Sequence, residues 1–100
     1  MIDFNKYQES VAMLCKQYKV KTLYVFGSAL TEKFGKESDV DFIVDFESLP
    51  VKDYVDNYFD FKFSLEAIFK RPVDLLEEKS LRNPYFIQSI NKHKRLVYGA

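Results

Sequence analysis

Residues 39–46, read DVDFIVDF, form the stretch of sequence that decides the fold. Apolar and acidic side chains alternate along it, which is typical of a strand with one face in the core. The even-numbered residues are all apolar and are predicted to face the core: Val40, Phe42, Val44 and Phe46. Asp39, Asp41, Ile43 and Asp45 share the other face. We expect Asp39 and Asp41 to project from it toward a cleft or solvent, and Asp45 to be a solvated acid at the strand end.

Helical spacing, turn residues and short apolar runs predict the elements on either side of this strand. They are a helix over 4–18, a strand over 22–26, a helical turn and loop within 29–36, a helix over 52–69, a strand over 73–77, a helix over 83–92 and an edge strand over 96–98. Strands that alternate with helices indicate an α/β fold, with a small mixed β-sheet and helices packed on it.

Two of these elements carry specific expectations about burial. The strand over 22–26 is apolar throughout its second half, which predicts burial on both faces. The helix over 52–69 is predicted to turn six side chains inward: Val55, Tyr58, Phe59, Leu65, Ile68 and Phe69. The same helix also carries Tyr54, Phe61 and Phe63, more aromatic rings than one helical stripe needs. Either the core face is wide, or some of these rings are exposed at a protein interface.

Composition excludes several classes of protein. The chain has 100 residues, which predicts a single domain over 1–100. Fifteen basic residues balance fifteen acidic ones, so neither nucleic acid nor a membrane surface is an expected partner. A single cysteine, Cys15, excludes a disulfide scaffold and predicts a buried thiol in the reducing cytoplasm. A single histidine, His93, argues against a zinc site, and neither a signal peptide nor an apolar span of about 20 residues is seen.

A set of acidic residues predicts metal-assisted phosphate chemistry. Asp39 and Asp41 are two residues apart on one strand, so their carboxylates share a face and repel each other unless a cation lies between them. Mg²⁺ prefers such oxygen ligands and leaves positions open for phosphate. Asp74 lies on a second strand that could pair beside them. Gly27 and Ser28 follow a buried strand and precede a helical turn, where backbone amides and a hydroxyl can reach phosphate oxygens.

These motifs together resemble those of a known family. Gly27-Ser28, ten further residues and then Asp39-Val40-Asp41 is similar to the signature of the minimal nucleotidyltransferases of the DNA polymerase β-like superfamily. The resemblance extends through Val73-Asp74-Leu75 to the C-terminal segment 96–99 and covers nearly the whole chain. It implies that Gly27 and Ser28 hold the triphosphate of ATP. It also implies that Asp39 and Asp41 bind Mg²⁺ and that Asp74 completes an acidic triad.

The resemblance implies an activity and a partner as well. Members of the family transfer a nucleoside monophosphate, usually AMP from ATP, to a hydroxyl. Small members often act as antitoxins of a HEPN-domain ribonuclease toxin by binding it and adding AMP to one of its tyrosines. A non-catalytic antitoxin that neutralises its partner by contact alone is the alternative, and a modifier of small molecules ranks lower. The nucleotide base and the oligomeric state stay open.

The segment after the glycine–serine pair departs from the family pattern. Many relatives have an arginine-containing stretch there, whereas this chain has ALTE at 29–32. Lys33, Gly35 and Lys36 are the candidates to contact the phosphates instead.

Overall fold

The computed structural model describes residues 2–31, 35 and 38–99. The helices are α1 (Gln8–Gln17), α2 (Val51–Phe69) and α3 (Pro84–His93), with short 3-10 turns η1 (Phe4–Tyr7), η2 (Gly27–Leu30) and η3 (Glu78–Ser80). The strands are β1 (Val20–Phe26), β2 (Val40–Phe46), β3 (Val73–Glu77) and β4 (Arg95–Tyr98). This order confirms the predicted sequence of elements. No helix within the described residues has the length and apolar character needed to cross a membrane.

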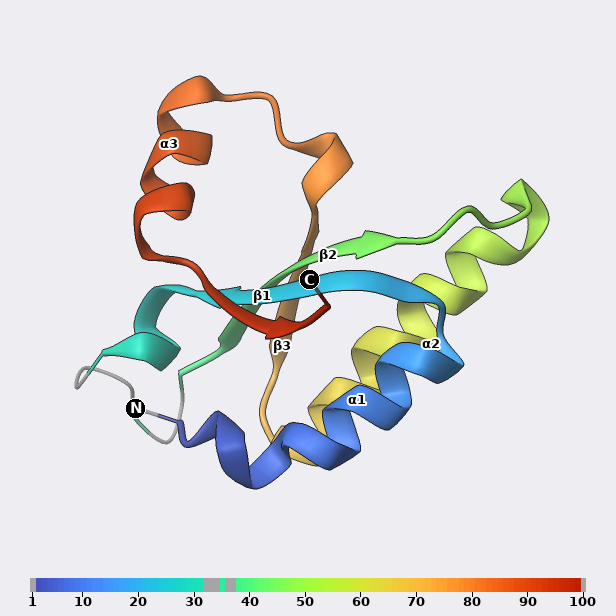
Figure 1. Cartoon of the computed structure of the whole chain (residues 1–100), viewed down its shortest axis with the longest axis horizontal. Helices are drawn as coiled ribbons and strands as arrows, with labels where there is room; N and C mark the ends of the chain where they lie inside the picture. Colours follow the sequence, from blue (N-terminus) through green and yellow to red (C-terminus); the bar gives the residue numbers. More distant parts are fainter. Residues whose placement is uncertain (1, 32–34, 36–37, 100) are drawn as a thin grey trace.

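The strands form one mixed sheet in the order β3-β2-β1-β4. β1 pairs antiparallel with β2 and with β4, whereas β2 and β3 are parallel and are connected through α2. Figure 1 shows α1 and α2 side by side along one side of the sheet and α3 on the other side. The α/β fold with a small mixed sheet is therefore confirmed.

The main core lies between the sheet and the pair α1–α2. Its largest fully buried side chains include Phe42 from β2, Leu23 from β1, and Phe61 and Leu65 from α2. Cys15 of α1 is fully buried among them, as predicted, and burial raises the pKa of its thiol to about 12. The thiol is therefore a structural group of the core.

The second face of β1 is less covered than its apolar sequence predicts. Leu23 and Val25 are fully buried, but Tyr24 and Phe26, which point to the opposite face, are only half-buried. The prediction that this strand is buried on both faces is wrong, because that face is covered only in part. Phe86 of α3 packs edge-on against Phe26, and the Lys94 ammonium lies 4.1 Å from the centre of the Tyr24 ring.

The inward face of α2 also differs from the prediction at two positions. Phe61, Leu65 and Phe69 are buried, whereas Val55 and Phe59 are 61% and 44% exposed, so their predicted inward orientation is wrong. The physical reason is the packing of α1 beside α2. Tyr18, at the end of α1, packs its ring against Phe61 and accepts a hydrogen bond of 2.8 Å from the Asn57 side chain at its carbonyl oxygen. These contacts turn Phe61 toward the core and leave Phe59 outside.

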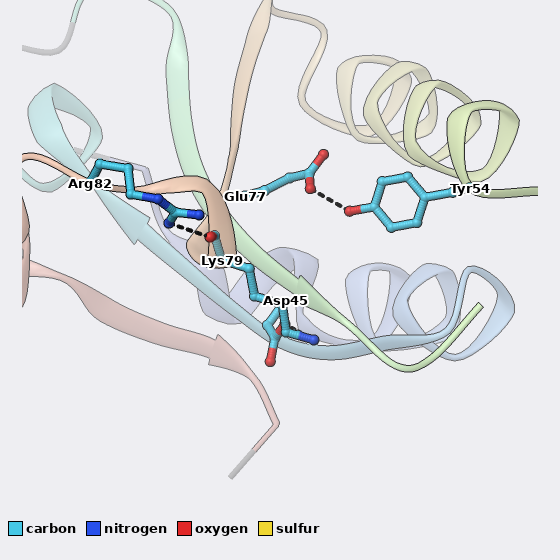
Figure 2. A network of polar contacts seen from close by, with 5 residues as sticks. All are labelled: Asp45, Tyr54, Glu77, Lys79 and Arg82. Carbon is cyan, nitrogen blue, oxygen red and sulfur yellow. Dashed lines mark hydrogen bonds and ion pairs between the residues drawn. The ribbon is translucent and has the colours of Figure 1, made fainter. Parts of the chain in front are cut away.

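Side chains of α2 protect the open edge of β3. Glu66 accepts a hydrogen bond of 2.9 Å from the Val73 amide, and the Tyr58 hydroxyl donates to the Leu75 carbonyl oxygen. The Tyr54 hydroxyl donates to the Glu77 carboxylate, which Figure 2 shows beside the Lys79–Asp45 ion pair. Unpaired edge strands invite association with other sheets, so these contacts favour a closed edge.

A matched pair of substitutions tests the orientation of α2. Phe61→Ala removes a fully buried ring and should lower the free energy of unfolding by about 3–5 kcal/mol. Phe63→Ala, two residues away at a side chain that is 57% exposed, should change it by less than about 0.5 kcal/mol. Urea denaturation followed by circular dichroism measures both. Equal losses for the two variants would contradict this orientation.

Candidate active site

Strand register brings the candidate residues together at one end of the sheet. Asp41 of β2 lies opposite Phe26, the last residue of antiparallel β1, and beside Asp74 of parallel β3. Gly27 follows Phe26 directly. The expectation that Asp74 stands beside the acidic pair of the neighbouring strand is therefore confirmed. Asp41, Asp74 and Gly27 form a row across three strands, on the face of the sheet that points away from α1 and α2.

Within residues 2–31, 35 and 38–99, no ion pair to a basic side chain compensates the carboxylates of this row. Asp41 is half-buried, and burial, followed by the charges of Asp74 and Asp39, raises the pKa of its carboxyl. Asp39 and Asp74 are exposed. A group whose neighbours all carry its own charge is stabilised by a cation, because a cation offsets both the repulsion and the loss of hydration.

Gly27 is required by the close approach of the Asp41 side chain. Its φ of +76° lies in the left-handed region, and a Cβ atom there would stand 2.6 Å from Oδ2 of Asp41. The Ser28 carbonyl oxygen accepts hydrogen bonds of 2.9 Å from both the backbone amide and the hydroxyl of Thr31. These bonds hold η2 as a tight turn directly beside Asp41, where the sequence placed the phosphate contacts.

The segment that leads into Asp39 is anchored by a residue that sequence reasoning missed. Arg71 donates from Nη1 to the carbonyl oxygens of Gly35 and Ser38, the second at 3.3 Å. The Gly35 amide in turn donates to the Ser38 hydroxyl at 3.0 Å. Lys70 enables this contact, since its left-handed φ of 55° ends α2 and turns the chain toward the segment. No spacing pattern in the sequence could have indicated it.

A pocket of about 500 Å³ opens next to Gly27, between η2 and α3. Its lining is mostly apolar: Phe26, Gly27, Leu30, Thr31, Phe86, Ser89, Ile90 and His93. Its volume is in the range of small-molecule sites. Apart from Gly27, sequence reasoning did not assign these residues to a site, because α3 is far from β1 in the chain. The spacing of Phe86, Ile90 and His93 at three to four residues was the available signal.

The donor set fits a hard divalent cation. Carboxylate oxygens are the ligands that Mg²⁺ prefers. Burial, and after it the charges of Asp74 and Asp39, raise the pKa of the Asp41 carboxyl, and a nearby cation would offset both effects. In the part of the chain that the structure describes, no three metal-ligating side chains already converge on one point. The strands therefore bring the aspartates side by side but do not close them around an ion. Lys33 and Lys36, the candidate phosphate contacts, lie outside the described residues.

A small mixed sheet with this row of carboxylates and a glycine–serine turn is the architecture of a nucleotidyltransferase. Residues 9–100 match the family described as Polymerase beta, Nucleotidyltransferase, so the chain belongs to that family. Two relatives from Methanocaldococcus jannaschii that carry the name protein adenylyltransferase are 35% and 33% identical to it over 86 residues. Each alignment covers 86% of this chain and 83% of the relative. The expectation of an enzyme of this class is confirmed.

Solved structures show the same fold. A minimal nucleotidyltransferase superposes with a TM-score of 0.74 at 24% identity, over 94% of this chain and 95% of its own. A chain of a toxin–antitoxin complex with AMP-PNP superposes with a TM-score of 0.70 at 19% identity. The superposition covers 93% of this chain and 73% of the other. A third similar chain comes from a complex of a tri-AMPylated Shewanella oneidensis HEPN toxin with MNT antitoxin. It superposes with a TM-score of 0.65 at 17% identity, over 98% of this chain and 74% of its own length.

The uncompensated charge at Asp41 predicts that Asp41→Asn stabilises the metal-free protein. Because the pKa of the folded-state carboxyl is raised, its ionised form disfavours folding at neutral pH. Asp41→Asn should therefore raise Tm at pH 7 in EDTA, and the gap should close as the pH falls to about 3, below the pKa of aspartate in both states. Mg²⁺ should raise Tm of the wild type more than that of the variant.

Differential scanning fluorimetry across this pH range gives the measurement. Asp60→Asn, at an exposed aspartate on α2, is the control and should leave Tm unchanged. A lower Tm for Asp41→Asn than for the wild type at pH 7 would show that Asp41 is compensated after all.

Proposed function

We propose that this chain transfers AMP from ATP to a tyrosine hydroxyl of a HEPN-domain toxin and thereby acts as its antitoxin, in the cytoplasm and as a single domain over 1–100. The observation that carries the proposal is the row of Gly27, Asp41 and Asp74 across three strands. It sets a close backbone approach, suited to phosphate, beside a group of carboxylates suited to a divalent cation.

The names of similar proteins support the identity of the transferred group, of the acceptor and of the partner. The Methanocaldococcus relatives carry the name protein adenylyltransferase, which points to AMP as the transferred group and protein as the acceptor. One structural neighbour comes from a complex with AMP-PNP, an ATP analogue, and another from a complex of an AMPylated HEPN toxin with an MNT antitoxin. The reducing cytoplasm agrees with the single unpaired cysteine, Cys15.

The apolar pocket beside Gly27 suits the nucleoside part of ATP. Phe26 and Phe86, whose ring centres are 6.3 Å apart, offer aromatic surface to a base at its mouth. Gly27 lies in the pocket wall and beside Asp41 at once. A nucleotide with its base in the pocket therefore extends its phosphates past Gly27 and Ser28 toward the carboxylates.

Asp39 and Asp41 are the residues that would hold Mg²⁺, with Asp74 as third carboxylate. When bound, the ion supplies positive charge that neutralises the triphosphate and the departing pyrophosphate. Gly27 lets the backbone approach the phosphates, and the Ser28 hydroxyl and amide donate hydrogen bonds to their oxygens. Arg71 keeps the segment before Asp39 in place through its bonds to Gly35 and Ser38.

The transfer is an in-line displacement at the α-phosphorus of ATP. The acceptor oxygen forms a bond to the α-phosphorus, the bond from the α-phosphorus to the oxygen bridging to the β-phosphorus breaks, and pyrophosphate leaves. Asp74, exposed at the end of the row, accepts the proton of the acceptor hydroxyl. Its exposure leaves room for a hydroxyl from a second protein.

The second candidate function is neutralisation of the partner by contact alone. The observation that favours it is the turn after the glycine–serine pair. Ala29, which is fully buried, and Leu30, which lines the pocket, carry apolar side chains and so offer no positive charge to the phosphates there. Binding without AMP transfer is the result that would distinguish this function from the first.

Transfer of label from α-³²P-ATP to a purified HEPN-domain toxin tests the proposal. The wild type with Mg²⁺ should label a tyrosine, and Asp39→Asn and Asp41→Asn should each reduce labelling by more than about a hundredfold. Asp45→Asn is the matched control, because Asp45 lies on the same strand and face but is paired with Lys79 at 3.4 Å. It should label at the wild-type rate.

Two outcomes would contradict the proposal. Tight binding of the partner by the wild type with no label transfer would favour neutralisation by contact. Equal labelling by the wild type and Asp41→Asn would show that the Asp41 carboxylate has no part in the transfer reaction.

A further inference from the structure

The outer side of α2 carries a continuous stripe of exposed apolar side chains. They recur every four residues and are 90%, 61%, 44% and 57% exposed in chain order: Val51, Val55, Phe59 and Phe63. Residues four apart lie on one helix surface, so this α2 stripe runs for about 18 Å along the first three turns of the helix. Isolated exposed apolar residues are ordinary, but a contiguous stripe indicates a surface that another molecule covers.

The rings of the α2 stripe are held in place before any partner arrives. Phe59 packs edge-on against Tyr58 at 5.0 Å between ring centres, and Phe63 lies 6.0 Å from Phe59. Tyr58 is fixed in turn by its hydrogen bond to the Leu75 carbonyl oxygen. A pre-ordered aromatic pair loses little conformational entropy on binding, which is typical of the residues that dominate interfaces.

A row of acidic residues borders the α2 stripe. Asp53, Asp56 and Asp60 recur three and four residues apart and are all exposed. None of them forms an ion pair with another residue in the described ranges, where the recorded pair is Lys79 with Asp45. Lys52, which is also exposed, is the basic residue that directly precedes Asp53 in the first turn of α2. This α2 acidic row is therefore available to basic groups of a partner.

We propose that the α2 stripe and the α2 acidic row dock a helix of the acceptor protein, one whose apolar face is bordered by lysine or arginine. The inference rests on the proposed function for the identity of that protein. An apolar helix face of about three turns matches the length of the stripe, and a basic border matches the acidic row.

Charge favours a different protein over a second copy of this chain. When two copies of one helix pack antiparallel about a two-fold axis, the same flank of each helix faces the other. The acidic row would then face itself, with Asp56 and Asp60 of the two copies in mutual repulsion. A partner with a basic border avoids this cost.

Docking at α2 is separate from the chemistry. α2 lies on one side of the sheet and α3 on the other (Figure 1). Phe42 is buried on the α2 side, and strand alternation turns Asp41 to the opposite side, where Ile43 of the same strand face lines a pocket with residues of α3. The stripe therefore holds the acceptor protein, and another part of that protein presents its hydroxyl to Asp74. Loss of the stripe should raise KM for the acceptor and leave both kcat and KM for ATP unchanged.

Two double variants with matched controls test this surface. Val55→Gln with Phe63→Gln removes apolar area at exposed positions that the fold does not need, and Asp56→Lys with Asp60→Lys reverses the acidic row. The controls are Met13→Gln, at an exposed apolar residue of α1, and Glu9→Lys, at an exposed acid of α1. Titration calorimetry with the purified HEPN-domain protein gives Kd, circular dichroism confirms folding, and sedimentation velocity reports self-association.

Each double variant should weaken binding by at least about tenfold, whereas the controls bind as the wild type does. The loss from charge reversal should shrink at high salt. Equal affinity of the wild type and both double variants for the HEPN-domain protein would overturn the docking site alone. A wild type that binds no HEPN-domain protein would overturn the proposed partner together with it. Stripe-dependent self-association of the chain would assign the surface to a second copy instead.

Discussion

The parallel pairing of β2 with β3 is the constraint on which the site depends, because it sets Asp41 beside Asp74. Two carboxylates at neighbouring register positions repel each other, and burial adds to the cost at Asp41, whose pKa is raised. The described residues place no cation in contact with this pair. The described residues thus retain an electrostatic cost at one end of the sheet, which a bound divalent cation would relieve.

The sheet separates binding from chemistry by strand alternation. Successive residues of β2 point to opposite faces, so Phe42 enters the core under α1 and α2 while Asp41 faces α3. The α1–α2 layer then carries stability on its inner side and the proposed docking surface on its outer side. On the other face, among the described residues, α3 with η3 and Leu81 covers the sheet in part, and the pocket beside Gly27 opens there. A change on one face therefore need not disturb the other.

The site was more predictable from the sequence than the packing around it. Asp41 and Asp74 are carried on strands, whose period of two determines their face without knowledge of neighbours, and Asp39 directly precedes β2. The face of α2 depends instead on where α1 crosses it, and the Asn57–Tyr18 hydrogen bond that couples them joins residues 39 apart in sequence. α2 itself carries aromatic residues on most of its sides, so periodicity alone could not place Phe59 outside and Phe61 inside. The role of Arg71 was equally hidden, since it acts through backbone carbonyls.

A crystal structure with Mn²⁺ and a non-hydrolysable ATP analogue tests the central claim most directly. We expect an anomalous manganese peak in contact with carboxylate oxygens of Asp39 and Asp41, the phosphates against Gly27 and Ser28, and the base in the pocket beside Phe26 and Phe86. Manganese bound away from these aspartates, or a nucleotide on another face of the sheet, would contradict it.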